Sequence, residues 1–299
     1  MFKHSVALSW MALCSFGALL GACSSGPAHT RAEGLLSSLS GATHYVSPAG
    51  LDSNPGTLSN PFKTIQKCAT VSSAGDSCLI QAGTYRETVT PNSGVSFAPY
   101  NGESVTLDGS DPVTGWTPYS GSIYQASVSL PVSGSSDTGF LANQIFAGGV
   151  MLPEAQWPNP SGDLMRPNWA SMGPGTTQSL IRDSNIPPIN WAGAVLHLWS
   201  GRNPFGHQTA HVLSSGSGQV TTDFNNPGVC PDLCAQEGGR YYLVGKLEAL
   251  DAPGEWFYDG ANGRLYLWPS SGNVPANITA KRRNYAFDLT GKSNVTIRN

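Results

Sequence analysis

The sequence predicts an all-β fold in which short strands stack as successive coils. Gly and Pro occupy 35 and 22 of the 299 positions, and charged residues make up only 12%, a composition typical of turn-rich β structure. Eight Trp, ten Tyr and ten Phe residues indicate a substantial buried core. Apolar pairs two positions apart also recur at short spacing, as in Val95 with Phe97 and then Val105 with Leu107. Such spacing favours stacked coils, although taken alone it also fits a β-sandwich.

The first residues predict an export signal, which we place at residues 1–22. Lys3 and His4 precede an apolar run, Val6–Leu20, that is shorter than the roughly 20 residues a membrane-spanning helix requires. A basic start followed by a short apolar run is typical of signal peptides. We therefore expect the protein to be exported.

The end of this run resembles the bacterial lipobox. The matching residues are Leu20-Gly21-Ala22-Cys23, and the resemblance implies that Cys23 is lipidated and begins the mature protein. Ser24, rather than Asp, follows the cysteine, which by the same resemblance implies an outer-membrane lipoprotein at the cell surface. The alternative is a plain secretory peptide cleaved near Ala28, which leaves the protein periplasmic or secreted. Residues 23–42, rich in Ser and Gly, are expected to form a flexible tether.

Residues 43–111 are predicted to form a cap and the first coils. A short strand around residues 44–47 leads into a loop, and Asn60 is the expected N-cap of a helix with Pro61 at its first position. We expect this helix to end at about Ser72 and to be followed by strands. The residues on its apolar face are Phe62, Ile65, Cys68 and Ala69. Stacked coils have an open apolar end, and an amphipathic helix before the first coil would cover it.

This segment resembles the N-terminal part of secreted right-handed parallel β-helix proteins. Those proteins share the pattern DxNPGT…PFxTIQxA…GDxxxxxxGTYxE. Its positions are filled here by Asp52, Asn54, Pro55, Gly56, Thr57, Pro61, Phe62, Thr64, Ile65, Gln66, Ala69, Gly75, Asp76, Gly83, Thr84, Tyr85 and Glu87. The resemblance implies a right-handed parallel β-helix of the pectate-lyase-like kind. It does not imply one reaction, because lyases, hydrolases, epimerases and binding proteins share this architecture.

The cysteines predict disulfides. One of the six is removed with the signal and one is lipidated, which leaves four. Disulfides persist in exported proteins, and we expect two local pairs, Cys68 with Cys78 and Cys230 with Cys234. The alternative is a zinc site built from the same four residues, but the Cys-x3-Cys pair has no second pair of matching spacing. We therefore expect no metal site.

Residues 112–283 break the rhythm of the coils and are predicted to be a β-rich inserted domain. Seven of the eight Trp residues lie here, among long loops. One hairpin is expected to turn at Ala147-Gly148-Gly149. Another is expected to pair residues 256–258 with residues 265–267 across the turn between them.

Two segments of this region resemble bacterial β-helix glycoside hydrolases. Those proteins carry QxFxxGxxxxxARWPN and LDxPGEWYxDxxTGxLYxxP ahead of their main run of coils. The first pattern is matched by Gln144, Phe146, Gly149, Trp157, Pro158 and Asn159, with Gln156 where Arg is common. The second is matched by Leu250, Asp251, Pro253, Gly254, Glu255, Trp256, Asp259, Gly263, Leu265, Tyr266 and Pro269. The resemblance implies a carbohydrate-active protein.

Residues 284–299 are predicted to begin the next coils, because apolar pairs recur there as well. In the resembling proteins several more coils follow such a segment. We therefore expect the chain to be the N-terminal part of a larger protein whose catalytic carboxylates lie beyond Asn299. By the same reasoning we expect residues 24–299 alone to be catalytically inactive.

Three acidic residues are candidates for catalysis within the chain. Glycoside hydrolysis needs two carboxyl groups, about 5 to 5.5 Å apart for retention or about 6.5 to 9.5 Å apart for inversion. Asp251, Glu255 and Asp259 carry the right groups along one segment. In the resembling families, however, the catalytic acids lie on later coils. Turn and hydrogen-bonding roles are therefore the alternative for these three.

Two further residues are candidates for substrate binding. Trp157 lies beside an expected exposed loop and offers a flat face to a sugar ring, although most tryptophans in strands belong to the core. Arg202 is suited to hold the carboxylate of an acidic sugar through a bidentate contact. The three histidines His197, His207 and His211 are expected to be buried or to anchor loops, since Gly and Pro oppose the helix on which a His-x3-His pair binds metal.

The sequence therefore favours a surface-anchored extracellular polysaccharide-active protein, a glycoside hydrolase that needs no cofactor. One alternative is a polysaccharide lyase, which would use a Lys or Arg base and often Ca²⁺. Another is a non-catalytic module that binds glycans or adheres. The net charge of −3, without an extended basic run, excludes an electrostatic footprint for nucleic acid. We expect a monomer whose partners are a polysaccharide and the lipid of the outer membrane.

Overall fold

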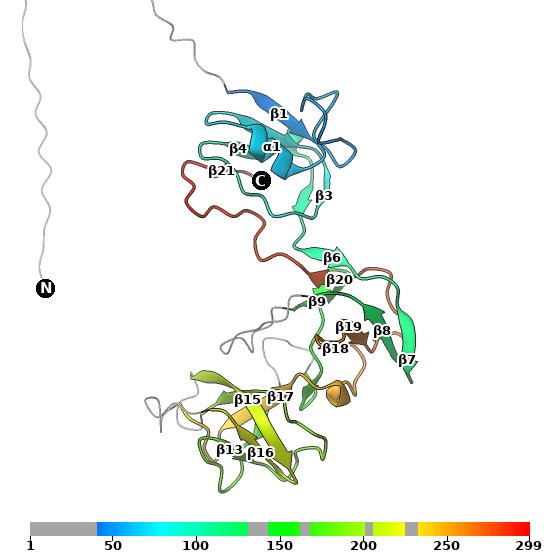
Figure 1. The fold of residues 1–299 in the computed structure, drawn as a ribbon, viewed down its shortest axis with the longest axis vertical. Helices are drawn as coiled ribbons and strands as arrows, with labels where there is room; N and C mark the ends of the chain where they lie inside the picture. The colour runs from blue at the N-terminus through cyan, green and yellow to red at the C-terminus, as the bar shows by residue number, and fades with distance from the viewer. Residues whose placement is uncertain (1–40, 131–142, 162–167, 201–205, 225–232) are drawn as a thin grey trace, which may run out of the picture. The chain divides into compact units, whose positions relative to one another are not determined.

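The structure, a computed structural model, describes residues 41–130, 143–161, 168–200, 206–224 and 233–299. Within these ranges it is nearly all β (Figure 1). The described helices are α1 (Ile65–Val71) and two short 3-10 segments, η1 (Tyr100–Gly102) and η2 (Leu247–Ala249). None of them is long and apolar enough to cross a membrane.

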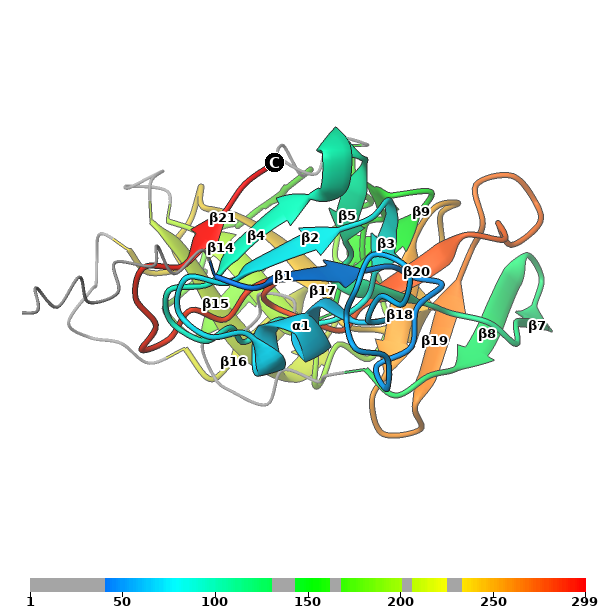
Figure 2. The same cartoon turned by 90° about the horizontal axis from the view of Figure 1, so that it is seen from above.

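Two parallel sheets form the coils of a β-helix. One has the strand order β1-β2-β4-β21, the other pairs β3 with β5, and every pairing in both is parallel. Figure 2 shows β1, β2, β4 and β21 side by side. The strands are β1 (Thr43–Val46), β2 (Ser77–Ile80), β3 (Gly83–Tyr85), β4 (Ser96–Pro99), β5 (Val105–Leu107) and β21 (Thr296–Ile297). The parallel β-helix fold predicted from the sequence is confirmed.

A third line of contact closes the coils. Val89 forms a parallel bridge with Phe287, and the Val89 N–H donates to the Ala286 carbonyl at 2.9 Å. One coil therefore runs through β2, β3 and Val89, and the next runs through β4, β5 and Phe287. Strand β21 begins a third. The insertion occupies the chain between β5 and Phe287, so it interrupts the second coil between two of its faces.

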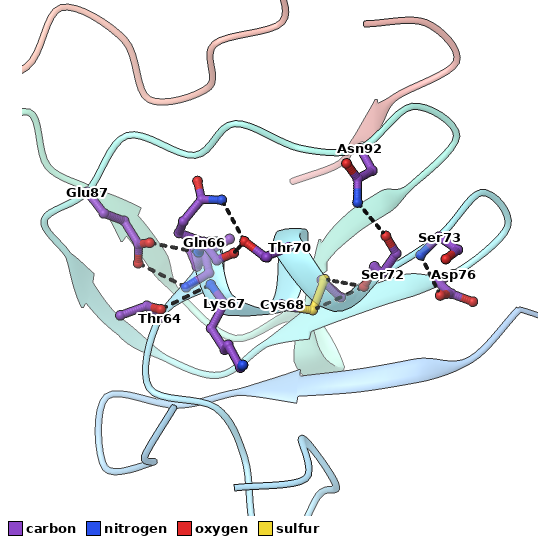
Figure 3. The surroundings of a disulfide bond; sticks show 12 residues. Thr64, Gln66, Lys67, Cys68, Thr70, Ser72, Ser73, Asp76, Glu87 and Asn92 are labelled. Atoms are coloured by element: carbon purple, nitrogen blue, oxygen red, sulfur yellow. Dashed lines mark hydrogen bonds between the residues drawn. A yellow bond between two sulfur atoms is a disulfide. The ribbon is translucent and has the colours of Figure 1, made fainter. Parts of the chain in front are cut away.

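Helix α1 packs against the β-helix core. The buried residues of this core are Val46, Phe62, Ile65, Cys68, Ala69, Cys78, Ile80, Tyr85, Val89, Val95 and Phe97. The predicted disulfide between Cys68 and Cys78 is present, with the two Cα atoms 6.2 Å apart and both side chains fully buried (Figure 3). It ties α1 to β2, as expected for a lid over the first coil.

Polar contacts from the first coil satisfy both ends of α1 (Figure 3). The Glu87 carboxylate, just after β3, accepts the backbone N–H of Ile65 at 2.9 Å and of Gln66 at 2.8 Å. At the other end, the Asn92 amide donates to the Ser72 carbonyl at 2.9 Å. Because these groups would otherwise be unpaired helix ends, the contacts hold the lid in place and explain why Glu belongs to the GTYxE motif.

The helix begins later than predicted. Its N-cap is Thr64, whose hydroxyl accepts the Lys67 N–H at 3.1 Å, so the prediction of Asn60 as the N-cap is wrong. The reason is that Phe62 forms a parallel bridge with β1, which keeps the chain extended beyond Asn60. Asp52 then accepts the N–H and the hydroxyl of Thr64, both at 2.9 Å, and fixes the start of the helix.

The insertion contains two separate cores, the first of them in two antiparallel sheets. Their strand orders are β10-β9-β20-β6 and β18-β19-β8-β7. The strands are β6 (Ser110–Pro112), β7 (Thr117–Ser120), β8 (Ile123–Ser127), β9 (Ile145–Ala147), β10 (Val150–Met151), β18 (Trp256–Asp259), β19 (Arg264–Leu267) and β20 (Ile278–Lys281). Both predicted hairpins are confirmed, because β9 pairs with β10 across Gly148-Gly149 and β18 pairs with β19.

The second core of the insertion lies on a seven-stranded sheet. Its order is β11-β17-β14-β15-β16-β13, with β12 also paired to β17. The strands are β11 (Gln156–Trp157), β12 (Ala170–Ser171), β13 (Leu180–Arg182), β14 (Val195–Trp199), β15 (His207–Gly216), β16 (Gln219–Thr222) and β17 (Arg240–Val244). Trp191 and Tyr241 are its largest fully buried side chains. The sequence pointed to a single inserted domain and did not distinguish these two cores.

Candidate functional site

The two ends of the insertion meet beside β3 and β5. Strand β6, where the insertion starts, pairs antiparallel with β20, where it ends, so Ser110 lies opposite Lys281. Arg283 then donates to Asp111 Oδ1 at 2.7 Å, although the two residues are 172 positions apart. A segment inserted into a coil must leave and return at neighbouring points. That topology gathers polar residues from distant parts of the chain.

A groove of about 740 Å³ lies at this junction. We call it the polar groove, and the side chains that matter for its chemistry are those of Arg86, Asp108, Gln144, Phe146, Asn277, Lys281 and Arg283. Arg86 follows β3 and Asp108 follows β5, at equivalent positions on successive coils. The remaining residues come from β9, β20 and the chain beside them. The volume is that of a small-molecule site.

One carboxylate organises the cations of the polar groove. Arg86 Nη2 lies 3.1 Å from Asp108 Oδ2. Burial alone would raise the pKa of Asp108, but hydrogen bonds from the Ser110 N–H and hydroxyl, with the charges of Arg86 and Arg283, outweigh it and hold that pKa below its ordinary value. Asp108 is therefore ionised at neutral pH and keeps Arg86 oriented along the groove.

Lys281 is the unpaired charge of the polar groove. Among the described residues, its ammonium group has no hydrogen-bond or ion-pair partner. With Arg86 and Arg283, the described lining holds three cations and one carboxylate. The amides of Gln144 and Asn277 add neutral donors and acceptors, and Phe146 adds an apolar ring. This set is suited to hold the hydroxyl and anionic groups of a sugar while one ring face stacks.

The three predicted acids lie away from the lining of the polar groove. Asp251 is exposed. Asp259 ends β18 and accepts hydrogen bonds from the Ala261 N–H at 3.0 Å and the Asn262 amide at 2.6 Å. The Asn262 side-chain contact is the main cause that holds the pKa of Asp259 below its ordinary value. That geometry is the one expected of a turn residue.

Glu255 is the chemically unusual member of the three. Its side chain is 1% exposed, Oε2 accepts the Ala252 N–H at 3.2 Å, and Oε1 has no partner among the described residues. Burial, with a smaller contribution from the charge of Asp251, raises its pKa to about 7. Glu154, which forms a parallel bridge with Trp256 next to Glu255, was not among the acids predicted from the sequence. Burial raises its pKa to about 7 as well.

Trp157 is the last residue of β11 and lies next to the irregular segment that follows it, where Asn159 is exposed. The Trp157 side chain is half-buried and packs against the core of the seven-stranded sheet, with its ring centroid 6.0 Å from that of Tyr241. Arg202, Cys23 and Cys230 lie outside the described residues. Cys234 is disulfide-bonded. The role of Trp157 in sugar binding stays a prediction.

The three histidines lie on strands, not on a helix. His197 Nδ1 is 3.2 Å from His207 Nε2, and His211 Nδ1 is 3.0 Å from Asp223 Oδ2. Burial lowers the pKa of His197 to about 3 and also lowers the pKa of His207. No group of three or more potential metal ligands occurs in the described part of the chain.

None of the side chains named for the polar groove was predicted as a site residue from the sequence, and only Gln144 and Phe146 matched a motif. Asp108-Gly109-Ser110 and Lys281-Arg282-Arg283 were visible as polar clusters at the two ends of the proposed insertion. The signal that would have joined them is topological. Both ends of an insertion must lie together, so polar clusters at its two boundaries are neighbours in space.

The fold defines a class, the parallel β-helix proteins. A family model described as a protein of unknown function, DUF1565, matches residues 48–134. The chain is 37% identical over 76 residues to the uncharacterized protein YwoF of Bacillus subtilis, a match that covers 23% of this chain and 16% of that protein. It is also 37% identical over 75 residues to pectate lyase PEL9 of Emericella nidulans, covering 22% and 18% of the two chains.

One solved structure, described as a glycoside hydrolase, superposes with a TM-score of 0.58 at 18% identity. The alignment covers 80% of this chain and 45% of that one, so the likeness extends beyond the coils into the insertion. At this identity it shows the fold alone. The chain spans less than half the length of the relatives it matches.

Proposed function

We propose that this chain is part of a polysaccharide-active protein, a glycoside hydrolase, whose glycan lies in the polar groove. The observation that carries the proposal is the groove itself, in which Lys281, two guanidinium groups, three amide residues and the Phe146 ring line about 740 Å³. Oligosaccharides are bound by this combination of hydroxyl-directed hydrogen bonds and ring stacking. The sequence similarity to a pectate lyase and the structural likeness to a glycoside hydrolase support the carbohydrate class.

The polar groove supplies binding rather than a complete set of hydrolytic groups. Asp108 is the one carboxylate in its described lining and is ion-paired with Arg86, whereas hydrolysis uses two carboxyl groups. The second candidate is a lyase, in which a basic residue removes a proton next to a uronate carboxylate. The unpaired Lys281 and the match to pectate lyase PEL9 favour that alternative.

We further propose that the protein is exported and lies outside the cytoplasm. Residues 1–22 act as the export signal, and a lipid on Cys23 anchors the chain to the outer membrane through the tether that follows. Mass spectrometry of the mature protein tests this directly. An N-terminal diacylglyceryl-modified Cys23 supports anchoring, a free N-terminus near Ala28 supports plain secretion, and a retained Met1 contradicts export.

Two product assays with purified mature protein test the reaction. Neutral and acidic polysaccharides are incubated with the protein, and new reducing ends and ultraviolet absorbance are measured. Reducing ends without absorbance indicate hydrolysis, whereas absorbance from an unsaturated product indicates elimination. Binding without either product indicates a non-catalytic glycan module. If the protein neither binds nor cleaves any glycan in the panel, the proposal is wrong.

Variants link the activity to the polar groove. Lys281→Gln and Gln144→Ala are expected to weaken glycan binding at least about tenfold, the effect of losing one good hydrogen-bonded contact. Lys63→Gln is the matched control, because Lys63 is an exposed lysine in the loop before α1 and lies outside the groove lining. Equal affinities for Lys281→Gln, Gln144→Ala and the unaltered protein would assign glycan binding to another surface.

A further inference from the structure

A second surface with binding chemistry lies on the seven-stranded sheet. Side chains alternate between the two faces of a strand, and the register of β14 with β17 separates them cleanly. The pairs on the core face are Leu196 with Leu243 and Leu198 with Tyr241. The pairs on the opposite face are Val195 with Val244, His197 with Tyr242 and Trp199 with Arg240. That opposite face is aliphatic at one end and aromatic and basic along the rest.

The rings on this face form a continuous array, which we call the aromatic strip. The Trp169 and Trp199 rings meet edge to face with centroids 4.6 Å apart, and the Trp199 centroid is 4.5 Å from that of His207. Tyr242 stacks on His197 at 4.5 Å, with the ring planes 6° apart. The strip therefore crosses β17, β14 and β15 from the chain just before β12.

The aromatic strip lies outside the three hydrophobic cores and opens to solvent at Trp169, while His197 is buried and the other three rings are half-buried. None of its five residues belongs to the three core clusters of the described chain. Trp169 remains 38% exposed although it contacts two other side chains. A large aromatic ring left partly exposed forgoes the free energy that burying its apolar surface would supply. A group of neighbouring exposed apolar side chains marks a binding site more often than a single exposed residue does.

The charge beside the strip indicates which ligand it suits. Arg240 is exposed, and its guanidinium carbon lies 5.8 Å from the Trp169 ring centroid. Among the described residues this guanidinium has no carboxylate partner. His197 and His207 are uncharged at neutral pH because burial lowers the pKa of each. Arg240 is thus the fixed positive charge of the strip, although the partly buried Glu154 acts electrostatically on Tyr242.

We propose that the aromatic strip and Arg240 form a second glycan-binding site, specific for a chain of acidic pyranoses. A sugar ring packs its apolar face on Trp169, and Arg240 holds the carboxylate of that ring or its neighbour through paired N–H donors. The site shares no residue with the polar groove. It binds without cleaving, so it keeps a polysaccharide near the protein while another segment of the same polymer occupies the groove.

Matched probes separate stacking from charge. Calorimetry of the mature protein measures the affinity for a hexamer of galacturonic acid and for its fully methyl-esterified form, which has the same rings without charge. Trp169→Ala is expected to weaken both affinities at least about tenfold, because stacking serves both probes. Arg240→Gln is expected to weaken the affinity for the acidic hexamer about tenfold and to leave the affinity for the ester unchanged. The acidic hexamer alone should lose affinity with added salt.

Two controls match the altered residues. Tyr119→Ala removes an exposed aromatic ring that meets Tyr266 edge to face on a different sheet. Arg182→Gln removes an exposed arginine from β13, at the far end of the strand order of the same sheet. Both are expected to bind like the unaltered protein. Unchanged thermal unfolding of all four variants shows that losses of affinity are not losses of fold.

The variant Lys281→Gln distinguishes the strip from the polar groove. Affinity that survives Lys281→Gln and falls with Trp169→Ala belongs to the strip, even if the function proposed for the groove is wrong. The inference is overturned if neither probe binds, if Trp169→Ala binds both probes normally, or if Lys281→Gln abolishes all binding. If Arg240→Gln loses affinity equally for both probes, the proposed specificity for acidic sugars is wrong.

Discussion

The β-helix and the insertion differ in strand pairing, strand length and number of cores. In the β-helix every pairing is parallel, the strands are three or four residues long or shorter, and one core runs through the stack. In the insertion the sheets are antiparallel, β15 reaches ten residues, and there are two cores. Parallel coils repeat a short local pattern, whereas the antiparallel sheets join strands that no repeat relates. The strand arrangement of the β-helix can therefore be predicted from local sequence, and that of the insertion cannot.

The two regions also contribute to the two candidate binding surfaces in different ways. The coils contribute Arg86 and Asp108 to the polar groove from equivalent positions on neighbouring windings. The seven-stranded sheet presents the aromatic strip across paired strands. In the coils, equivalent positions on successive windings lie next to each other, whereas the antiparallel sheet brings together residues from strands that no repeat relates. Removing single side chains from each region tests how far the regions are independent.

Deleting the largest fully buried side chain of each region is expected to have the greatest effect. Trp191 and Phe97 are 0% and 1% exposed and belong to different cores. Trp191→Ala and Phe97→Ala should each reduce the free energy of unfolding by about 3–5 kcal/mol, from lost apolar burial and the cavity left behind. Trp191→Ala also removes the indole hydrogen bond to the Pro187 carbonyl at 3.2 Å. Urea unfolding measures both losses.

Hydrogen exchange shows whether each loss stays in its own region. Trp191→Ala should speed exchange in β14 and β17 more than in β2 and β4, and Phe97→Ala should do the reverse, since separate cores open as separate units. If both variants speed exchange equally in all four strands, the two regions unfold as one unit and the contrast drawn here fails.

The second largest effect is expected in the lid. Reducing or replacing the Cys68–Cys78 disulfide frees a loop whose ends are ten positions apart, and the chain-entropy model puts its contribution at about 3 kcal/mol. The double variant Cys68→Ser/Cys78→Ser should therefore unfold at lower urea concentration. The loss should fall on β1, β2 and α1 in hydrogen exchange. A uniform loss that includes β14 would contradict the assignment of the bridge to the lid alone.

The lid also shows how much of the fold local sequence specifies. Glu87, Asp52 and Asp76 were recognised as motif residues before their partners were known. The structure gives each a physical role, because their carboxylates accept backbone N–H groups at 2.6–2.9 Å around α1 and the first strand. Such short-range roles are predictable from sequence. The register of β17 between β11 and β14 is not, because it joins segments with no shared pattern.

The next effect concerns Glu255 in the insertion and depends on pH. Its folded-state pKa of about 7 lies above the ordinary value of 4.5, so the folded protein binds this proton more tightly than the unfolded chain. The stability that the group contributes is fully present below pH 4.5 and is lost as the pH rises through 7. The shift corresponds to a loss on the order of 3 kcal/mol. Urea unfolding at pH 5 and pH 8 measures it.

The variant Glu255→Gln removes the titration while keeping the shape. It should remove the Glu255 share of the fall in stability between pH 5 and pH 8 and leave the share of Glu154, whose pKa burial also raises to about 7. At pH 8 it should be more stable than the unaltered protein. Glu248→Gln is the matched control, because Glu248 is exposed on η2. The same pH dependence in Glu255→Gln and the unaltered protein would show that Glu255 is ionised or solvated in the folded state.

The candidate site was less predictable than the fold, for a reason that the insertion makes plain. The sequence pointed to Asp251, Glu255 and Asp259 because they carry catalytic groups within one segment. The polar groove instead joins Asp108 to Lys281 through the pairing of β6 with β20. Likewise, Trp157 matched a motif, yet Trp169, just before β12, is the more exposed ring. The chemical type of each residue can be taken from the sequence, but which residues lie next to one another depends on the topology of the fold.

The smallest expected effect tests the corrected start of α1. Thr64 accepts the Lys67 N–H and donates its hydroxyl to Asp52 at 2.9 Å, so Thr64→Ala should cost about 1 kcal/mol, the usual value of an N-cap. Thr64→Ser keeps both contacts and should lose only a few tenths. Asn60→Ala should also be nearly neutral, because the Asn60 side chain bonds only the exposed Ser59 hydroxyl, at 3.3 Å. A larger loss in Asn60→Ala than in Thr64→Ala would restore Asn60 as the residue that starts the helix.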